Sequence, residues 1–172
     1  MSQAIITAVS LIAAFLLQTA VLPVFGISSV APDLVFIVLI PAAMLWNPYP
    51  TAVMGAVVGL FIDILFGRAI GVYAIPYLLA PWLAGSYGKQ FFRENAFLPA
   101  GIAGGAVLAR EIITAVMIFL GRMNLIITWG IVLRVLGSAL LTVALTIPYH
   151  LIFYSVTLKR ERWRPGLFYI GR

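Results

Sequence analysis

The sequence contains no cysteine and a single histidine, and only 9% of its 172 residues are charged. Without cysteine the chain can form no disulfide and offers no thiolate ligand. One histidine excludes a multi-histidine metal site built from this chain alone. Ordinary globular domains carry about a quarter charged residues, so the charge here is too sparse for a water-soluble surface. We therefore expect neither a soluble enzyme nor a bound metal or cofactor.

Apolar residues make up 63% of the chain, and the mean hydropathy is +1.12. A helix that crosses a membrane needs about 20 apolar residues. The pattern predicts an all-α membrane protein with six transmembrane helices in one bundle, residues 1–158, and a basic cytoplasmic tail, residues 159–172. The six apolar segments are separated by glycine, proline and asparagine turns or by charged loops: 4–22, 34–46, 51–66, 72–87, 97–120 and 125–158.

Basic residues predict the orientation, because cytoplasmic loops carry more lysine and arginine. With six spans, the loop containing Lys89 and Arg93 lies on the same side as the tail, which contains five basic residues. Arg68 and Arg122 lie on the other side. We therefore predict that both termini are cytoplasmic. If the short second segment and the third formed one re-entrant unit, the N-terminus would lie on the opposite side.

The net charge of +6 favours anionic membrane lipid over nucleic acid as a partner. The tail combines its cations with Trp163, Phe168 and Tyr169, a mixture typical of the headgroup region. It serves either as a topological anchor or as a recruitment site for a cytoplasmic protein.

Two glycine pairs have the spacing that permits close approach of membrane helices. They are Gly55-xxx-Gly59 and Gly101-xxx-Gly105. Either pair can pack helices inside one bundle or form the seam of a homodimer, and we expect internal packing.

Four ionisable residues lie within the predicted spans: Asp63, Arg110, Glu111 and Arg134. At about 1.5 Å per helical residue, all four reach a similar level in the outer half of the membrane. Charges at that depth are costly, so they pair with one another or mark function. They are expected either to form ion pairs that fix helix register or to line an outward-facing cavity. We expect Asp63 to lie close to Arg110 or Arg134.

The sequence contains no Ser/His/Asp constellation, no metal-ligand cluster and no phosphate-binding loop. We therefore assign no catalytic residue and do not expect an enzyme.

The most distinctive motif lies in residues 55–77. Gly55-Ala-Val-Val-Gly59-Leu60-Phe61-Ile62-Asp63 is followed by Gly67, Gly71-Val72-Tyr73 and Tyr77. This stretch resembles the signature of the rod shape-determining protein MreD family, in which a Gly-Leu-x-x-Asp stretch precedes glycines and an aromatic-rich helix. Gln18, Pro23 and Pro32-Asp33-Leu34 also fit, as do the length and the basic C-terminus.

The resemblance implies a non-enzymatic component of the bacterial inner membrane that belongs to the cell-elongation machinery, the elongasome. It implies direct binding to the bitopic protein MreC. Through MreC it implies association with the MreB filament, the RodA glycosyltransferase and its transpeptidase partner. In this role the protein is a scaffold that helps regulate peptidoglycan synthesis and cell shape.

The outer ends of the third and fourth segments are the expected docking surface for MreC. Glycines there let a partner backbone approach, and tyrosines combine apolar area with one polar tip. The residues expected to bind the partner are Asp63, Phe66, Gly67, Arg68, Tyr73 and Tyr77.

A rival function follows from a second similarity. The MreD family is similar in architecture to the substrate-binding component of energy-coupling-factor transporters, a six-helix bundle with an outward pocket. The alternative is therefore capture of a small, vitamin-type solute. Ala4-xxx-Ala8 offers the small-residue face that such a component would present to its energising partner, although this spacing is common in membrane helices. A membrane enzyme is a weaker third possibility.

Overall fold

The computed structural model describes residues 2–21, 30–66, 71–88, 97–120 and 129–162, and this part of the chain is helical without any strand. The prediction of an all-α protein is therefore confirmed. Each of the six predicted apolar segments corresponds to one helical stretch. The elements are α1 (Ser2–Leu16), continued by the π-helical turn η1 (Leu17–Val21), then α3 (Leu34–Leu45), α4 (Pro48–Phe66), α5 (Ala74–Gly88), α6 (Phe97–Leu120) and α7 (Trp129–Arg162).

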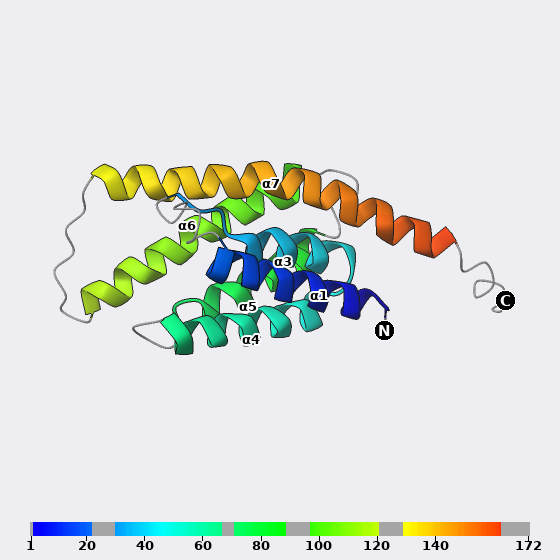
Figure 1. Ribbon diagram of the computed structural model, residues 1–172, viewed down its shortest axis with the longest axis horizontal. Helices are drawn as coiled ribbons and strands as arrows, with labels where there is room; N and C mark the ends of the chain where they lie inside the picture. The colour runs from blue at the N-terminus through cyan, green and yellow to red at the C-terminus, as the bar shows by residue number, and fades with distance from the viewer. Residues whose placement is uncertain (1, 22–29, 67–70, 89–96, 121–128, 163–172) are drawn as a thin grey trace.

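Four helical stretches are long and apolar enough to cross a membrane. They are Gln3–Ala20, Pro48–Leu65, Phe97–Val116 and Trp129–Val156. In contrast, α3 has 12 residues, about 18 Å of helix against a hydrocarbon core of about 30 Å. The start of α1 and the end of α7 lie at the same end of the molecule (Figure 1), as an even number of crossings requires. Six crossings with cytoplasmic termini remain a prediction.

The central helix of the bundle is α3. Its sequence contains no polar residue, and every side chain from Val35 to Leu45 is buried. A helix that is apolar on all sides is stable only where all sides are covered. Here α1, α4, α5, α6 and α7 all pack against it. Its shortness therefore reflects enclosure within the bundle, where both of its ends are met by other parts of the chain.

The outer helices present apolar side chains to the surroundings. On α1 the exposed side chains include Ile5, Val9 and Ile12, which are 57–61% exposed. On α4, Phe61 and Ile64 are 57% and 66% exposed. Soluble monomers rarely expose so many large apolar side chains on neighbouring helices. A protein in a bilayer needs such a surface, because it contacts lipid. Together with the four long apolar helices, it identifies a transmembrane protein.

The two glycine pairs have different positions. A Cβ added at Gly55 would lie 2.1 Å from the carbonyl oxygen of Tyr77, and one at Gly59 would lie 2.6 Å from the Cα of Ala74. This pair therefore brings the backbones of α4 and α5 into contact, as the prediction of internal packing requires. Gly101 and Gly105 have no atom within 4 Å of an added Cβ and lie on the exposed face of α6.

The last helix is longer than the bundle. With 34 residues, α7 continues past position 158 to Arg162, and 34 residues amount to about 51 Å of helix. It runs along one side of the other helices and extends beyond them (Figure 1). The predicted division between bundle and tail therefore falls inside a continuous helix.

Candidate functional site: a buried polar cluster at the start of α3

Asp33 is the centre of the polar cluster, and it is 1% exposed. It is the N-cap of α3, where its Oδ1 accepts a hydrogen bond from the Phe36 N–H at 3.2 Å. A carboxylate in this position satisfies one of the N–H groups that a helix start leaves without a partner. The Tyr77 hydroxyl donates to the same carboxylate at 2.9 Å. The backbone N–H of Asp33 donates to Thr142 Oγ1 at 2.9 Å. Asp33 therefore connects α3 to α5 and α7.

Arg110 of α6 completes the charge pair. Its Nη1 forms an ion pair with Asp33, and its Nη2 donates to Glu111 at 2.5 Å. The guanidinium carbon lies 5.3 Å from the centre of the Tyr73 ring, which is a cation–π distance. Only 11% of the Arg110 side chain is exposed, against 34% for Glu111. One arginine therefore links a buried carboxylate to a partly exposed one.

Asp63, near the end of α4, has a different role. Its Oδ2 accepts from the backbone N–H groups of Gly71 at 2.8 Å and Ala74 at 3.1 Å. Its Oδ1 accepts from the Tyr73 N–H at 2.9 Å. These donors belong to the first turn of α5 and the residues before it, where a helix has free N–H groups and a positive partial charge. Asp63 thus caps α5 from a neighbouring helix. Gly71 has a φ of 105°, which favours glycine at this turn.

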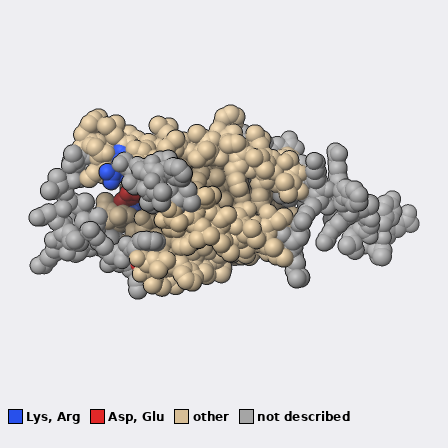
Figure 2. Space-filling view, in the orientation of Figure 1, with Lys and Arg blue, Asp and Glu red and all other residues tan. Residues whose placement is uncertain are grey.

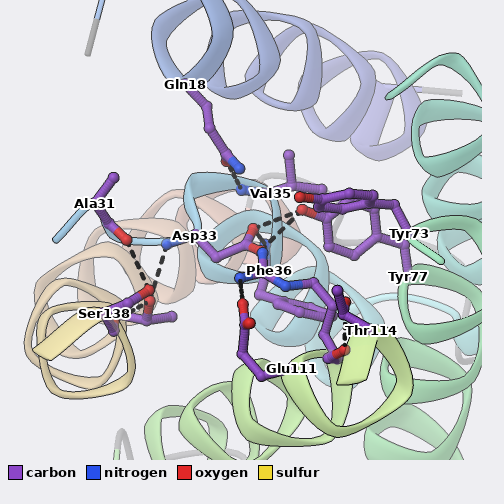
Figure 3. A network of polar contacts seen from close by, with 12 residues as sticks. Gln18, Ala31, Asp33, Val35, Phe36, Tyr73, Tyr77, Glu111, Thr114 and Ser138 are labelled. Atoms are coloured by element: carbon purple, nitrogen blue, oxygen red, sulfur yellow. Dashed lines mark hydrogen bonds and ion pairs between the residues drawn. The ribbon is translucent and has the colours of Figure 1, made fainter. Parts of the chain in front are cut away.

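The chain that enters α3 is held from two further sides (Figure 3). Gln18 Oε1 in η1 accepts from the Val35 N–H at 3.3 Å. Ser138 of α7 donates to the Ala31 carbonyl at 2.7 Å. The turn η1 and the helices α5, α6 and α7 therefore each contribute a polar group at or near the start of α3. Because membrane interiors offer no water to satisfy polar groups, this point should be the most strongly specified part of the fold.

The intramembrane charges have different partners in the structure from those expected. Arg110 and Glu111 do contact one another, but the buried carboxylate that pairs with Arg110 is Asp33. Among the described residues, the ion pairs are Asp33–Arg110 and Arg110–Glu111. Asp63 is bound by backbone N–H groups instead, and Arg134 lies on an exposed part of α7. Reasoning from depth alone missed Asp33, although a carboxylate directly before a wholly apolar run is a helix N-cap signal.

The expected partner-binding residues do not all lie on the surface. Tyr77 is fully buried, Asp63 is 3% exposed, and Tyr73 is half-buried. The Phe66 side chain, Gly67 and Arg68 lie outside the described residues. A partner that docks here would therefore touch Tyr73 and the turn that Asp63 holds, while Asp63 and Tyr77 would act from beneath that surface.

The acidic side chains of the cluster bind groups of the chain itself. The described residues contain no group of three or more His, Asp or Glu side chains placed to hold a metal ion. The carboxylates of Asp33 and Asp63 are each occupied by three or more donors. On the face that Figure 2 shows, acidic and basic side chains lie close together near one end of the molecule.

These features define a helical membrane protein whose buried polar residues hold the helices in register. The sequence model of the rod shape-determining protein MreD matches residues 1–156, and the chain belongs to this family. The match includes every helix from α1 to α6 in full and α7 as far as Val156. No curated protein and no solved structure matches the chain. The family and the apolar helices together assign the protein to bacterial cell-shape determination at the membrane.

Proposed function

We propose that the protein is a non-enzymatic component of the cell-elongation complex that binds MreC and helps regulate peptidoglycan synthesis. The observation that carries the proposal is the family match over residues 1–156, on a bundle whose polar residues serve its own architecture. Association with MreB, RodA and the transpeptidase would follow through MreC. The protein would reside in the inner membrane with both termini in the cytoplasm.

The docking surface in this proposal is the turn between α4 and α5. Asp63 binds the N–H groups of Gly71, Tyr73 and Ala74, so the backbone at residues 71–74 is held in place before a partner arrives. A preformed surface loses less conformational entropy on binding. Tyr73 is half-buried and lies against Arg110, which leaves part of its ring available. A helix of MreC just outside the membrane would place apolar anchors at i, i+3, i+4 and i+7 against this surface.

A matched pair of tyrosine variants tests the surface. Tyr73→Ala should reduce co-purification of MreC in mild detergent, while Tyr87→Ala should not. Tyr87 lies at the other end of α5 and is 68% exposed, so it controls for the loss of a tyrosine. Membrane insertion and elution volume should be unchanged in both variants. Equal recovery of MreC with the two variants would refute this docking surface.

Cysteine crosslinking locates the contact, and the absence of native cysteine makes it specific. Probes at positions 68 and 73 should capture the membrane-proximal region of MreC. Capture only by a probe at position 93, in the predicted cytoplasmic loop, would place the contact on the opposite side. If the protein were instead a transporter component, the Tyr73→Ala change would abolish uptake of a small solute and leave MreC recovery unaltered.

A further inference from the structure

The seam between α6 and α7 is packed over only part of its length. On α6 the face toward α7 includes Gly104, where an added Cβ would lie 2.6 Å from Val143 Cγ2 and 3.9 Å from the Ala139 carbonyl oxygen. The two helices are antiparallel, and beyond this contact the end of α6 and the start of α7 diverge (Figure 1). Toward the end where α6 stops, the faces that continue this contact are partly exposed: Leu108 of α6 is 38% exposed and Leu136 of α7 is 48% exposed. We call this part of the seam open.

In the open part of the seam, α6 and α7 each continue the helix face that they present to one another at Gly104. On α7, Val132 and Leu136 lie on the helical stripe of Ala139 and Val143, with spacings of four, three and four residues. Leu136 is 48% exposed and Val132 is half-buried. The matching stripe on α6 continues from Gly104 to Leu108, which is 38% exposed, and to Glu111 and Ala115. Two complementary helical stripes thus lie uncovered at the same level.

Glu111 makes this open seam chemically distinctive. It shares Arg110 with Asp33, so among the described ion pairs one cation serves two carboxylates, and these three groups carry one net negative charge. Glu111 lies nine residues before Leu120, the end of α6 and of its apolar run, which is about 14 Å of helix from that end. An uncompensated carboxylate at that depth is unfavourable. The seam therefore favours an occupant that carries a positive charge.

Within the described residues of α6 and α7, the rest of the seam does not supply that charge. The stripe of α7 at the level of Glu111 is Val132 and Leu136, which are apolar. Arg134 lies at the same level of α7, but on the helix face that carries Ser138 and Thr142. Those two side chains form hydrogen bonds with the backbone just before α3. Among the described acidic residues, none lies within ion-pair distance of Arg134. A lipid tail would fill the apolar part but would bring no cation to Glu111.

We infer that the open half of the α6–α7 seam is a docking site for a single apolar helix that presents a lysine or arginine to Glu111. The apolar stripes provide the packing surface, and Glu111 selects the charge and the depth of the incoming helix. This site is separate from the turn at Tyr73, and its test does not require MreC.

The experiment uses the full chain in lipid vesicles with synthetic apolar transmembrane peptides as probes. The peptides are identical except for one guest residue, Lys, Leu or Glu, at the depth of Glu111, and each carries one cysteine a turn away. The reporter is Leu136→Cys, and the control is Leu141→Cys, which is 40% exposed and lies on the opposite side of α7. The Lys peptide should crosslink to position 136 about tenfold more than the Leu peptide, the size of one polar interhelical contact in a membrane.

Glu111→Gln should remove the preference for lysine, and crosslinking at position 141 should be low and independent of the guest residue. Equal yields for the Lys and Leu peptides on the chain with Glu111 intact would overturn the inference, whether or not the Glu111→Gln variant folds. A lysine preference that survives Glu111→Gln would also overturn it. So would rapid disulfide formation in a Leu108→Cys/Leu136→Cys variant without peptide, since the seam would then close on itself.

Discussion

The Tyr77 hydroxyl and the Asp33 carboxylate lie 2.9 Å apart in the interior of the bundle. Tyr77 also packs its ring edge-on against Phe36, with centroids 4.6 Å apart. One side chain of α5 thus contributes both apolar packing and a hydrogen bond at the start of the central helix. The carboxylate it bonds is also the partner of Arg110, so helices from the two halves of the chain meet at one buried charge.

Removal of the Asp33 carboxylate should strongly destabilise the protein. Asp33→Ala would leave the Arg110 guanidinium without its buried partner, and breaking a buried ion pair on one side costs about 3–5 kcal/mol. The measurement is the free energy of unfolding in detergent or bicelles. Arg134→Ala is the control, because it removes a charge that is exposed and should cost little.

The two residues of this pair should also be coupled. The double variant Asp33→Ala/Arg110→Leu should lose less stability than the sum of the two single changes, because neither charge is then left unpaired. Additive losses would mean that the pair contributes no interaction of its own.

The hydrogen bond from Tyr77 can be separated from its packing. Tyr77→Phe keeps the ring against Phe36 and removes only the hydroxyl. A hydrogen bond to a charged group contributes about 1.5–3 kcal/mol, so the unfolding free energy should fall by that amount. Tyr87→Phe, at the exposed end of α5, should leave it unchanged, and similar losses in both variants would argue against a special role for Tyr77.

Asp63 should control the order of one turn rather than the charge balance of the cluster. Asp63→Ala would leave the N–H groups of Gly71, Tyr73 and Ala74 without their acceptor, and each buried unsatisfied group costs about 1–3 kcal/mol. Hydrogen exchange at these three amides should accelerate much more than exchange in α3. Asp63→Asn keeps one acceptor oxygen and should have a smaller effect. Unchanged exchange in the alanine variant would show that the cap is not maintained in solution.

Helix positions follow well from the sequence, because glycine, proline and charge mark the limits of apolar runs. The segment predicted at 97–120 coincides with α6, and that predicted at 34–46 differs from α3 by one residue. The apolar run of the last segment ends near Leu158, where the sequence predicts the end of the bundle. Lysine, arginine and glutamate are good helix formers, so the helix continues to Arg162.

The partners of the buried charges were harder to predict, and the reason is geometric. Counting residues gives the depth of a side chain in the membrane but not the direction in which it points around its helix. Asp63 and Arg110 were placed at similar depth, yet Asp63 accepts from the backbone at the start of α5. Asp33 reaches Arg110 instead. That choice depends on helix rotation and on backbone donors, which a linear sequence does not show.

The glycine pairs give a prediction with an internal control. Gly55→Ala should destabilise the bundle, because the added methyl would lie 2.1 Å from the Tyr77 carbonyl oxygen and must separate α4 from α5. Gly101→Ala adds the same methyl where no atom lies within 4 Å, so it should leave the thermal stability of the monomer unchanged. If Gly101→Ala instead shifts the protein from dimer to monomer on sedimentation, the exposed pair on α6 forms the seam of a homodimer.

The number of membrane crossings depends on whether α3 crosses the membrane. Although α3 is only 12 residues long, the chain enters it beside α7 and leaves it directly into α4, so we count it as one crossing. With six crossings, residues 122 and 172 lie on opposite sides, and the more basic side is cytoplasmic. Reporter fusions that are active only in the cytoplasm should therefore be active at position 172 and inactive at position 122. Activity at both positions would remove the crossing by α7, whose apolar stretch is 28 residues long. A fusion between α3 and α4, at Asn47, then tests α3 itself: cytoplasmic activity there is expected for six crossings, and its absence would show that α3 does not cross.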